Sequence, residues 1–285
     1  MIRKVLVSPN LKKDPDFSTT KKTVSILLGC HITVYAESAY RGLLGEGVTY
    51  FEKGKLPEDA ELIIVLGGDG SVLRAAGTAV ELGIPVLGVN LGRLGFLNDL
   101  EKDSLYQLER LATGEYSEKT RMMLDVTVTQ GEKSTLLPFP LLNDVVISAN
   151  GHLADMVLEQ KGMCSIHYRA DGMVISTPSG STAYTLSAGG PVIDDRMDAI
   201  CVTPICPRSF FGRSVLFCPE DVLRIENVNS ADMVLSVVAD GVECGKIGRG
   251  DSIVVCRSEK KLRMIVFEPH PTLHVLQQKM NTQNF

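Results

Sequence analysis

The sequence predicts a two-domain protein, with an amino-terminal α/β domain followed by an antiparallel β domain. A βαβ unit over residues 61–90 places a helix between two short buried strands. Beyond residue 115 the apolar residues follow a period of two and recur in many short segments. We therefore expect domains over residues 1–118 and 119–268, and a C-terminal segment, 269–285, that docks back on the first domain.

The composition is that of a globular protein. Of 285 residues, 44% are hydrophobic and 22% are charged, and the net charge is -5. An acidic chain does not favour nucleic acid or an anionic membrane as a partner. Seven cysteines without a Cys-x-x-Cys pair are typical of free thiols in a reducing compartment. Since the sequence shows neither a signal-peptide core nor a spanning run of about 18 apolar residues, we expect a cytoplasmic protein.

The first elements of the amino-terminal domain are expected to be a strand, a helix and a second strand. The strands are predicted at residues 4–8 and 31–35, and the helix at residues 17–29, where Gly29 ends it. Residues 36–60 are glycine-rich and polar, with weak periodicity, so they receive no assignment.

A strand, a glycine-rich turn and a helix form the centre of this domain. Residues 62–66 are an unbroken apolar run, which is typical of a strand buried on both faces of a parallel sheet. The glycines of Gly67-Gly-Asp-Gly70 allow a sharp turn and a close approach by another molecule. Ser71 is expected to cap the helix that follows. Asp69 then lies where α/β sheets place their ligands, although the pattern also fits a plain strand-turn-helix junction.

A second glycine-rich loop follows the next strand. Residues 84–90 are predicted to be this strand, and Asn90-Leu-Gly-Arg-Leu-Gly-Phe-Leu97 begins at its carboxyl end. Because the carboxyl ends of parallel strands meet at one edge of a sheet, we expect the two loops side by side. Neither loop matches the dinucleotide fingerprint or the P-loop. A helix over residues 104–112 is expected to end at Gly114.

The β domain is predicted by alternation and by short apolar runs. Residues 122–129 alternate with a period of two over a long strand. Further strands are expected at residues 141–147, 156–159, 173–177, 199–203, 222–228, 234–239, 253–257 and 262–267. Turn residues separate these strands, which indicates antiparallel pairing.

Polar residues stand out at two places in the β domain. Asn143 and Asp144 interrupt an apolar strand, where polar groups need partners. The loop after the strand at 173–177 gathers several hydroxyls and a tyrosine between Ser179 and Ser187. This loop can cap its own helix, or it can bind a sugar or a nucleobase.

Five ordered motifs resemble the bacterial NAD kinase family. They are Gly67-Gly-Asp-Gly70, Asn90 to Leu97, Asn143-Asp144, Arg169-x-Asp-Gly172 and Thr177 to Pro191. The resemblance covers nearly the whole chain and implies a Rossmann-like α/β amino-terminal domain, an antiparallel β-sandwich-like carboxyl-terminal domain, and a homodimer or homotetramer. It also implies transfer of the terminal phosphoryl group of ATP, or in some members of polyphosphate, to the 2′-hydroxyl of the adenosine ribose of NAD, giving NADP.

The resemblance also implies the site residues. Asp69 takes the position of the family's proton acceptor; alternatively it orients the hydroxyl or helps to hold a magnesium ion. The residues implied to bind NAD are Asp69, Gly70, Arg74, Asn143, Asp144, Arg169, Asp171, Ser179, Thr182, Ala183, Tyr184, Thr185, Leu186 and Ser187. ATP and a divalent cation, Mg²⁺, are the expected phosphoryl donor and cofactor, and no residue is assigned to either.

The sequence departs from the family pattern at several positions. Asp144 stands where glutamate is more frequent, which shortens the reach of the carboxylate. Ser71 and Ser179 stand where threonine is frequent, and both keep a hydroxyl. Asp155 stands about where a basic residue or histidine is common, and Val242 where glutamine often follows Asp-Gly. These last two leave the contacts at the rim of the NAD site open.

Two other functions stay open at this point. Gly-Gly-Asp-Gly also occurs in lipid kinases that resemble this fold, and a non-catalytic sensor of NAD or NADP would need a pocket but no base. The Asn143-Asp144 pair and the Thr182-Ala-Tyr184 segment fit a nucleotide better than a lipid, and no basic amphipathic stretch for a membrane is present. Asp69 argues against the sensor, which has no need of a base.

Overall fold

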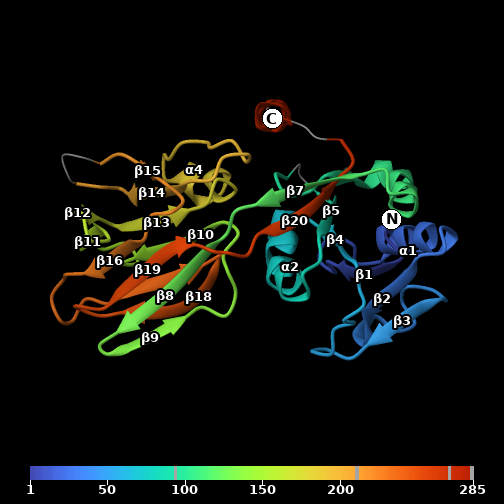
Figure 1. The fold of residues 1–285 in the computed structure, drawn as a ribbon, viewed down its shortest axis with the longest axis horizontal. Helices are drawn as coiled ribbons and strands as arrows, with labels where there is room; N and C mark the ends of the chain where they lie inside the picture. Colours follow the sequence, from blue (N-terminus) through green and yellow to red (C-terminus); the bar gives the residue numbers. More distant parts are fainter. Residues whose placement is uncertain (93–94, 209–211, 269–270, 283–285) are drawn as a thin grey trace. The chain divides into compact units, whose positions relative to one another are not determined.

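The computed structural model describes residues 1–92, 95–208, 212–268 and 271–282 (Figure 1). The chain forms two compact units. Unit 1 contains Met1–Thr120 and Leu262–Phe285, and unit 2 contains Arg121–Lys261. Within the described ranges, no helix is long and apolar enough to cross a membrane.

Unit 1 is built on a largely parallel sheet in the order β3-β2-β1-β4-β5-β20-β7, with β6 paired to β5. Its strands are β1 (Lys4–Pro9), β2 (Thr33–Glu37), β3 (Val48–Phe51), β4 (Leu62–Gly67), β5 (Val86–Asn90), β6 (Leu100–Glu101), β7 (Ser117–Arg121) and β20 (Leu262–Val266). Strand β1 pairs in parallel with both β2 and β4. From the neighbouring strands β1 and β4, the strand order runs outward in opposite directions, through β2 on one side and through β5 on the other. The carboxyl ends of β1 and β4 therefore mark the switch point, where such sheets bind ligands.

The helical elements of unit 1 include one long helix on each face of this sheet. They are α1 (Ser18–Gly29), η1 (Ser38–Tyr40), α2 (Asp69–Leu82), η2 (Lys102–Glu109), α3 (Arg110–Thr113) and α5 (Thr272–Thr282). Because the crossovers β1-α1-β2 and β4-α2-β5 run in opposite directions, the right-handed rule places α1 and α2 on opposite faces. Val5 and Val7 of β1 share a buried cluster with Val24 and Leu27 of α1. Leu6, between them, therefore faces the α2 side.

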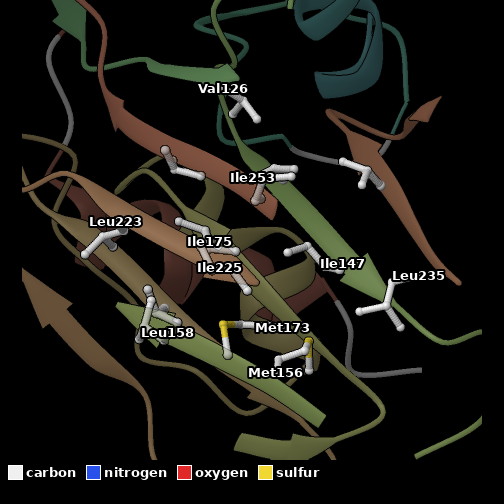
Figure 2. Close-up of a cluster of buried hydrophobic side chains, with 14 of the residues drawn as sticks. Val126, Ile147, Met156, Leu158, Met173, Ile175, Leu223, Ile225, Leu235 and Ile253 are labelled. Atoms are coloured by element: carbon white, nitrogen blue, oxygen red, sulfur yellow. The ribbon is translucent and has the colours of Figure 1, made fainter. Parts of the chain in front are cut away.

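Unit 2 consists of two antiparallel sheets. The first has the order β15-β14-β13-β10-β17-β18, and the second β12-β11-β16-β19-β8-β9. Its elements are β8 (Leu124–Gln130), β9 (Lys133–Leu136), β10 (Asp144–Ser148), β11 (Ala154–Gln160), β12 (Cys164–Ala170), β13 (Gly172–Ser176), η3 (Gly180–Thr182), α4 (Tyr184–Ser187), β14 (Ile200–Ile205), β15 (Val215–Phe217), β16 (Leu223–Asn227), β17 (Leu235–Ala239), β18 (Val242–Ile247) and β19 (Ser252–Arg257). Ile147 and Ile175 of the first sheet share one buried cluster with Ile225 and Ile253 of the second (Figure 2). The two sheets thus enclose a sandwich core.

The predicted fold class is confirmed, because a parallel sheet with helices precedes two antiparallel sheets along the chain. The end of the β domain differs from the prediction. Residues 262–267 were expected in the β domain, which was to extend to residue 268, but Leu262–Val266 forms β20 in the sheet of unit 1. A short apolar run fits a sandwich strand as well as a parallel strand, so periodicity does not separate the two.

Smaller differences between prediction and structure concern individual elements of unit 1. His31 has a φ of 57°, outside the strand region, and β2 begins only at residue 33. The unassigned residues 36–60 contain η1 and β3. The docking of residues 269–285 on the first domain stays a prediction, and residues 269–270 and 283–285 of that segment lie outside the described ranges.

Replacing Ile147 by alanine should lower the free energy of unfolding by about 2–5 kcal/mol, because the substitution leaves a cavity in the sandwich core. The Ile147 side chain is completely buried. Denaturant titration measures the change, with Ile166→Ala on the exposed edge strand β12 as the control, for which we expect about 0.5 kcal/mol or less. Equal, small losses for both variants would contradict the packing of the two sheets.

Candidate active site

The site residues predicted from the sequence form two groups, one in each unit. In unit 1, Asp69, Gly70 and Arg74 lie in the first two turns of α2. In unit 2, the others lie at the start of β10, at the end of β12 and in the loop after β13. Each group is held together by hydrogen bonds that involve carboxylates, hydroxyls and backbone amides.

The carboxylate of Asp69 is held by the second glycine-rich loop. Oδ2 of Asp69 accepts a hydrogen bond from the backbone N–H of Phe96 at 2.8 Å. Its Oδ1 accepts hydrogen bonds from the N–H of Leu97 at 3.0 Å and from Nδ2 of Asn98 at 2.8 Å. A Cβ atom at Gly95 would overlap Oδ1 of Asp69, so this loop needs a glycine there. A carboxylate has about four acceptor sites, so these donors leave about one for a substrate hydroxyl.

The loops therefore meet as predicted, in the part that the structure describes. Asp69 is the first residue of α2, directly after β4, and Phe96 to Asn98 follow β5. Residues 93 and 94 of the second motif lie outside the described residues. The pairing of β4 with β5 brings the two loops to one edge of the sheet.

Ser71 does not cap α2, contrary to the prediction. The N-cap residue is Gly68, which makes no side-chain capping hydrogen bond. The Oγ of Ser71 instead accepts hydrogen bonds from Nδ2 of Asn10 at 2.8 Å and from Nη2 of Arg74 at 3.1 Å. The helix begins two residues before Ser71, at Asp69, so the serine lies inside the first turn and links it to the end of β1.

Lys13 lies against both glycine-rich loops, although no sequence motif marks it. A Cβ atom at Gly68 would overlap its Nζ, and one at Gly92 would lie 3.0 Å from it. The backbone N–H of Lys13 donates to the carbonyl of Asn10 at 2.9 Å, which fixes the turn after β1. An ammonium group thus stands at the same edge of the sheet as Asp69.

A second carboxylate, that of Asp240, fixes the polar pair at the start of β10. It accepts backbone hydrogen bonds from Leu142 at 2.8 Å, Asn143 at 2.9 Å and Asp144 at 3.0 Å. The carbonyl of Asn143 accepts a hydrogen bond from the N–H of Thr177 at 2.9 Å. Asp240 belongs to the Asp-Gly pair that precedes Val242, and no sequence motif marked it as an anchor.

Asp144 occupies an unfavourable environment for a charge. Its side chain is buried, and this burial, with a smaller effect of the Asp240 carboxylate, raises its pKa to about 7. Burial also raises the pKa of Asp240, while its three backbone hydrogen bonds oppose that shift. Asp144 therefore changes its protonation state near neutral pH.

The loop after β13 packs tightly against the strands. A Cβ atom at Gly180 would overlap the carbonyl of Asn143, and the Gly180 N–H donates to Oγ1 of Thr177 at 3.0 Å. The hydroxyl of Thr185 is buried and donates to Oγ of Ser176 at 2.8 Å. These groups hold the loop in place, so some of its hydroxyls serve the local structure.

Other side chains of this group are open to solvent. Tyr184 and Leu186 are 46% and 44% exposed. Ser187 and Arg169 are exposed, whereas Asp171, Ser179, Thr182 and Ala183 are half-buried. Nε of Arg169 lies 3.9 Å from Oδ1 of Asp155, which also lies 3.5 Å from Nε2 of His167. The acid at position 155 is thus part of a charged cluster that includes Arg169.

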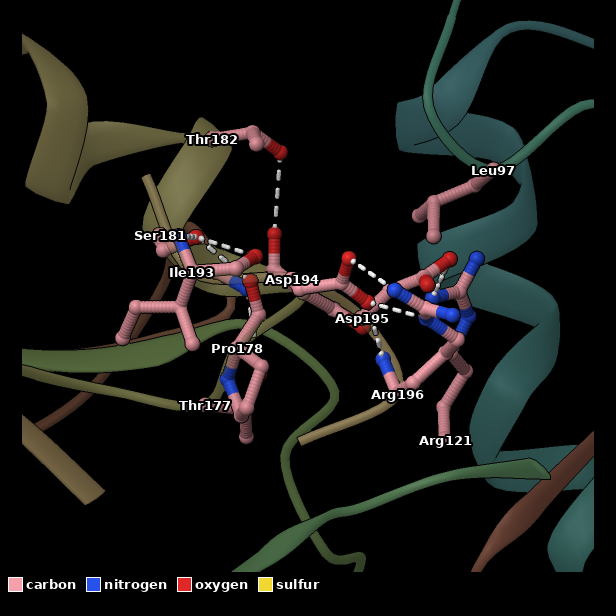
Figure 3. A network of polar contacts seen from close by, with 12 residues as sticks. Leu97, Arg121, Thr177, Pro178, Ser181, Thr182, Ile193, Asp194, Asp195 and Arg196 are labelled. Carbon is pink, nitrogen blue, oxygen red and sulfur yellow. Dashed lines mark hydrogen bonds and ion pairs between the residues drawn. The ribbon is translucent and has the colours of Figure 1, made fainter. Parts of the chain in front are cut away.

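A polar network fixes the segment that follows the loop (Figure 3). The hydroxyl of Ser181 donates to the carbonyl of Pro178 at 2.6 Å and accepts a hydrogen bond from the N–H of Ile193 at 3.0 Å. Two residues further on, Asp195 forms an ion pair with the buried guanidinium of Arg121. Ser181 thereby ties the loop after β13 to the segment at Ile193 that follows it.

A doubly wound sheet with a glycine-lined carboxylate at its switch point, followed by a sandwich with an anchored Asn-Asp pair, is typical of a two-domain ligand-binding protein. Two family models match the chain. The ATP-NAD kinase N-terminal domain matches residues 10–116, and the ATP-NAD kinase C-terminal domain matches residues 142–267. The chain belongs to the NAD kinase family and is a phosphotransferase, as the motifs predicted.

Similar proteins are known by sequence and by structure. NAD kinase of Lachnoclostridium phytofermentans is 34% identical over 98% of this chain and 99% of the relative. NAD kinase of Natranaerobius thermophilus is 35% identical over 98% of both chains. Yeast NADH kinase complexed with NADH has a TM-score of 0.83 at 21% identity, over 100% of this chain and 89% of that one. An NAD kinase from Archaeoglobus fulgidus in complex with ATP has a TM-score of 0.70 at 20% identity, over 98% and 96%.

Asp144→Asn should make the stability of the protein less dependent on pH. The pKa of Asp144 is about 7 in the folded protein, against about 3.9 for an aspartate in an unfolded chain. The folded state therefore binds more protons between these values, and the free energy of unfolding falls as pH rises through them. Between pH 5 and 8 the free energy of unfolding of the wild type should fall by roughly 2–3 kcal/mol more than that of the variant.

Denaturant titrations at both pH values measure this difference. Asp232→Asn, which removes an exposed carboxylate from the same unit, is the matched control and should follow the wild type. An Asp144→Asn variant with the pH dependence of the wild type would contradict the buried, titrating carboxyl group.

Proposed function

We propose that this enzyme uses ATP to phosphorylate the 2′-hydroxyl of the adenosine ribose of NAD, giving NADP, with Asp69 as the proton acceptor. The observation that carries this role is the geometry of the Asp69 carboxylate. It stands at the switch point of the sheet, is oriented by three donors, and keeps about one acceptor site for a hydroxyl. A base oriented in this way acts through its position as much as through its basicity.

The proposed step is an in-line phosphoryl transfer. The bond between the γ-phosphorus of ATP and its bridging oxygen breaks, so that ADP leaves. A new bond forms between this phosphorus and the ribose 2′-oxygen, and the hydroxyl proton passes to the carboxylate of Asp69. General base assistance of this kind contributes roughly 10² to 10⁴-fold.

A divalent cation, Mg²⁺, accompanies ATP in this proposal. In proteins Mg²⁺ is usually bound by one or two carboxylates together with substrate phosphates. Among the described residues, no group of three or more His, Cys, Asp or Glu side chains is arranged to hold a metal ion. In this proposal the phosphates of ATP supply ligands to the ion, which would neutralise the charge that the transfer creates, and we assign no residue to it.

The residues of unit 2 are proposed to bind NAD. Asp240 fixes the backbone of Asn143 and Asp144, which leaves the carboxyl group of Asp144 to accept a ribose hydroxyl. Arg169, Asp171 and the loop from Ser179 to Ser187 are proposed to supply further contacts. The family resemblance supports a cytoplasmic homodimer or homotetramer as the working assembly.

Asp69→Asn should lower kcat about 10²-fold or more, since the variant keeps the size of the side chain but loses its basicity. NADP formation from NAD, ATP and Mg²⁺ measures the rate, and calorimetry measures NAD binding, which should persist. Glu81→Gln, at an exposed position in the last turn of α2, should leave both unchanged. A loss of NAD binding with kcat intact would overturn the role of Asp69.

In parallel, labelled ATP offered with NAD or with diacylglycerol vesicles should label NAD alone.

The KM for NAD should fall as pH rises through about 7. The ionised carboxyl group of Asp144 accepts a stronger hydrogen bond from a ribose hydroxyl than the protonated group does, and its pKa is about 7. A single group with this pKa gives about a tenfold change in KM between pH 6 and 8. Steady-state kinetics at these pH values measure it, and Asp144→Asn should show a weak, nearly pH-independent affinity. A flat profile in the wild type would contradict the contact.

A further inference from the structure

Unit 1 contains a cavity of about 450 Å³ beside α2. Its floor includes Leu6 of β1 and Ile63 of β4, which point to the α2 face of the sheet. The connection from β2 to β3 contains only the short helix η1, so no long helix covers this face next to α2. The cavity is therefore a consequence of the topology, and it lies next to the switch point between β1 and β4.

Part of the lining suits a planar base and a sugar. Tyr40 and Phe51 are half-buried in its lining and offer aromatic surface. The ring of Tyr40 packs edge-on against Phe17, with a centroid distance of 5.8 Å, which anchors it. Asn10 and Glu37 add an amide and a carboxylate, which can hydrogen-bond a nucleobase or ribose hydroxyls.

The lining also contains two cationic side chains. They are Lys53, which follows β3, and Arg74, which hydrogen-bonds Ser71 in α2. From Ser71 the first turn of α2 leads to Gly68, and the Nζ of Lys13 lies against the Gly68 backbone. A helix N-terminus with cations around it favours phosphate groups. This row of groups ends beside Asp69, where phosphoryl transfer is proposed.

We propose that this cavity binds the nucleoside of ATP, and that Arg74 and Lys13 accompany its phosphates toward Asp69. The inference deepens the proposed function and rests on it for the identity of the ligand. The cavity volume lies in the range of about 300–1,000 Å³ that is usual for small-molecule sites. Aromatic and cationic side chains in one lining match a purine nucleoside triphosphate, whereas the acyl chains of a lipid would lie against the charged groups of Glu37, Lys53 and Arg74 and desolvate them.

Two variants test the cavity without changing Asp69. Thr78→Phe fills it from α2, since Thr78 is half-buried in the lining and more than two helical turns from Asp69. Lys53→Glu reverses a charge at an exposed position of the lining. Lys55→Glu makes the same change two residues further on, outside the lining, and is the matched control. Thermal unfolding of each variant checks that the fold is intact.

Calorimetric binding of AMP-PNP with Mg²⁺ to the full chain is the readout. We expect Thr78→Phe and Lys53→Glu to weaken this binding about tenfold or more, as the loss of one good contact would. Lys55→Glu should bind as the wild type does, and NAD affinity should stay the same in all three variants. Unchanged AMP-PNP binding by both cavity variants would overturn the inference.

Activity separates this inference from the proposed function. If the wild type makes NADP and the cavity variants bind AMP-PNP normally, the cavity assignment fails and the function stands. If the cavity variants lose AMP-PNP binding but the wild type phosphorylates no NAD, the proposed function fails and the nucleotide site stands.

Discussion

The hydrogen bonds between the Asp69 carboxylate and the loop at residues 96–98 are the constraint on which the rest of unit 1 depends. They require that β4 and β5 be neighbours, that α2 begin immediately after β4, and that Gly95 carry no side chain. The backbone donors leave the carboxylate little freedom to rotate, so its remaining acceptor site has a fixed direction. Orientation of this kind is the main contribution a protein can make to phosphoryl transfer.

Unit 2 also contains a carboxylate that accepts several backbone hydrogen bonds. The carboxylate of Asp240 accepts three backbone hydrogen bonds and so fixes the start of β10. The burial of Asp144 itself, with a smaller effect of the nearby Asp240 carboxylate, raises the pKa of Asp144 to about 7, which makes that side chain responsive to pH near neutrality. The carboxylate that orders the start of β10 thus adds a smaller part to the cost of ionising Asp144.

The fold class and most strands followed from the sequence, because periodicity and turn residues are local signals. The position of β20 did not follow, since the sheet that a strand joins depends on residues far away along the chain. Asp69 and Asp144 stood out through their motifs, whereas Asp240 looked like an ordinary turn residue. Lys13 and the cavity beside α2 were also missed, because their meaning comes only from the loops and strands that the fold brings around them.

A crystal structure of the inactive Asp69→Asn variant with NAD, AMP-PNP and Mg²⁺ tests the central claim most directly. The account predicts that the adenosine 2′-oxygen of NAD lies about 2.6–3.2 Å from the side chain at position 69, with the γ-phosphorus on its other side. It also predicts the loop at 96–98 in the arrangement described above. A 2′-oxygen bound far from this side chain, with both ligands ordered, would contradict the account.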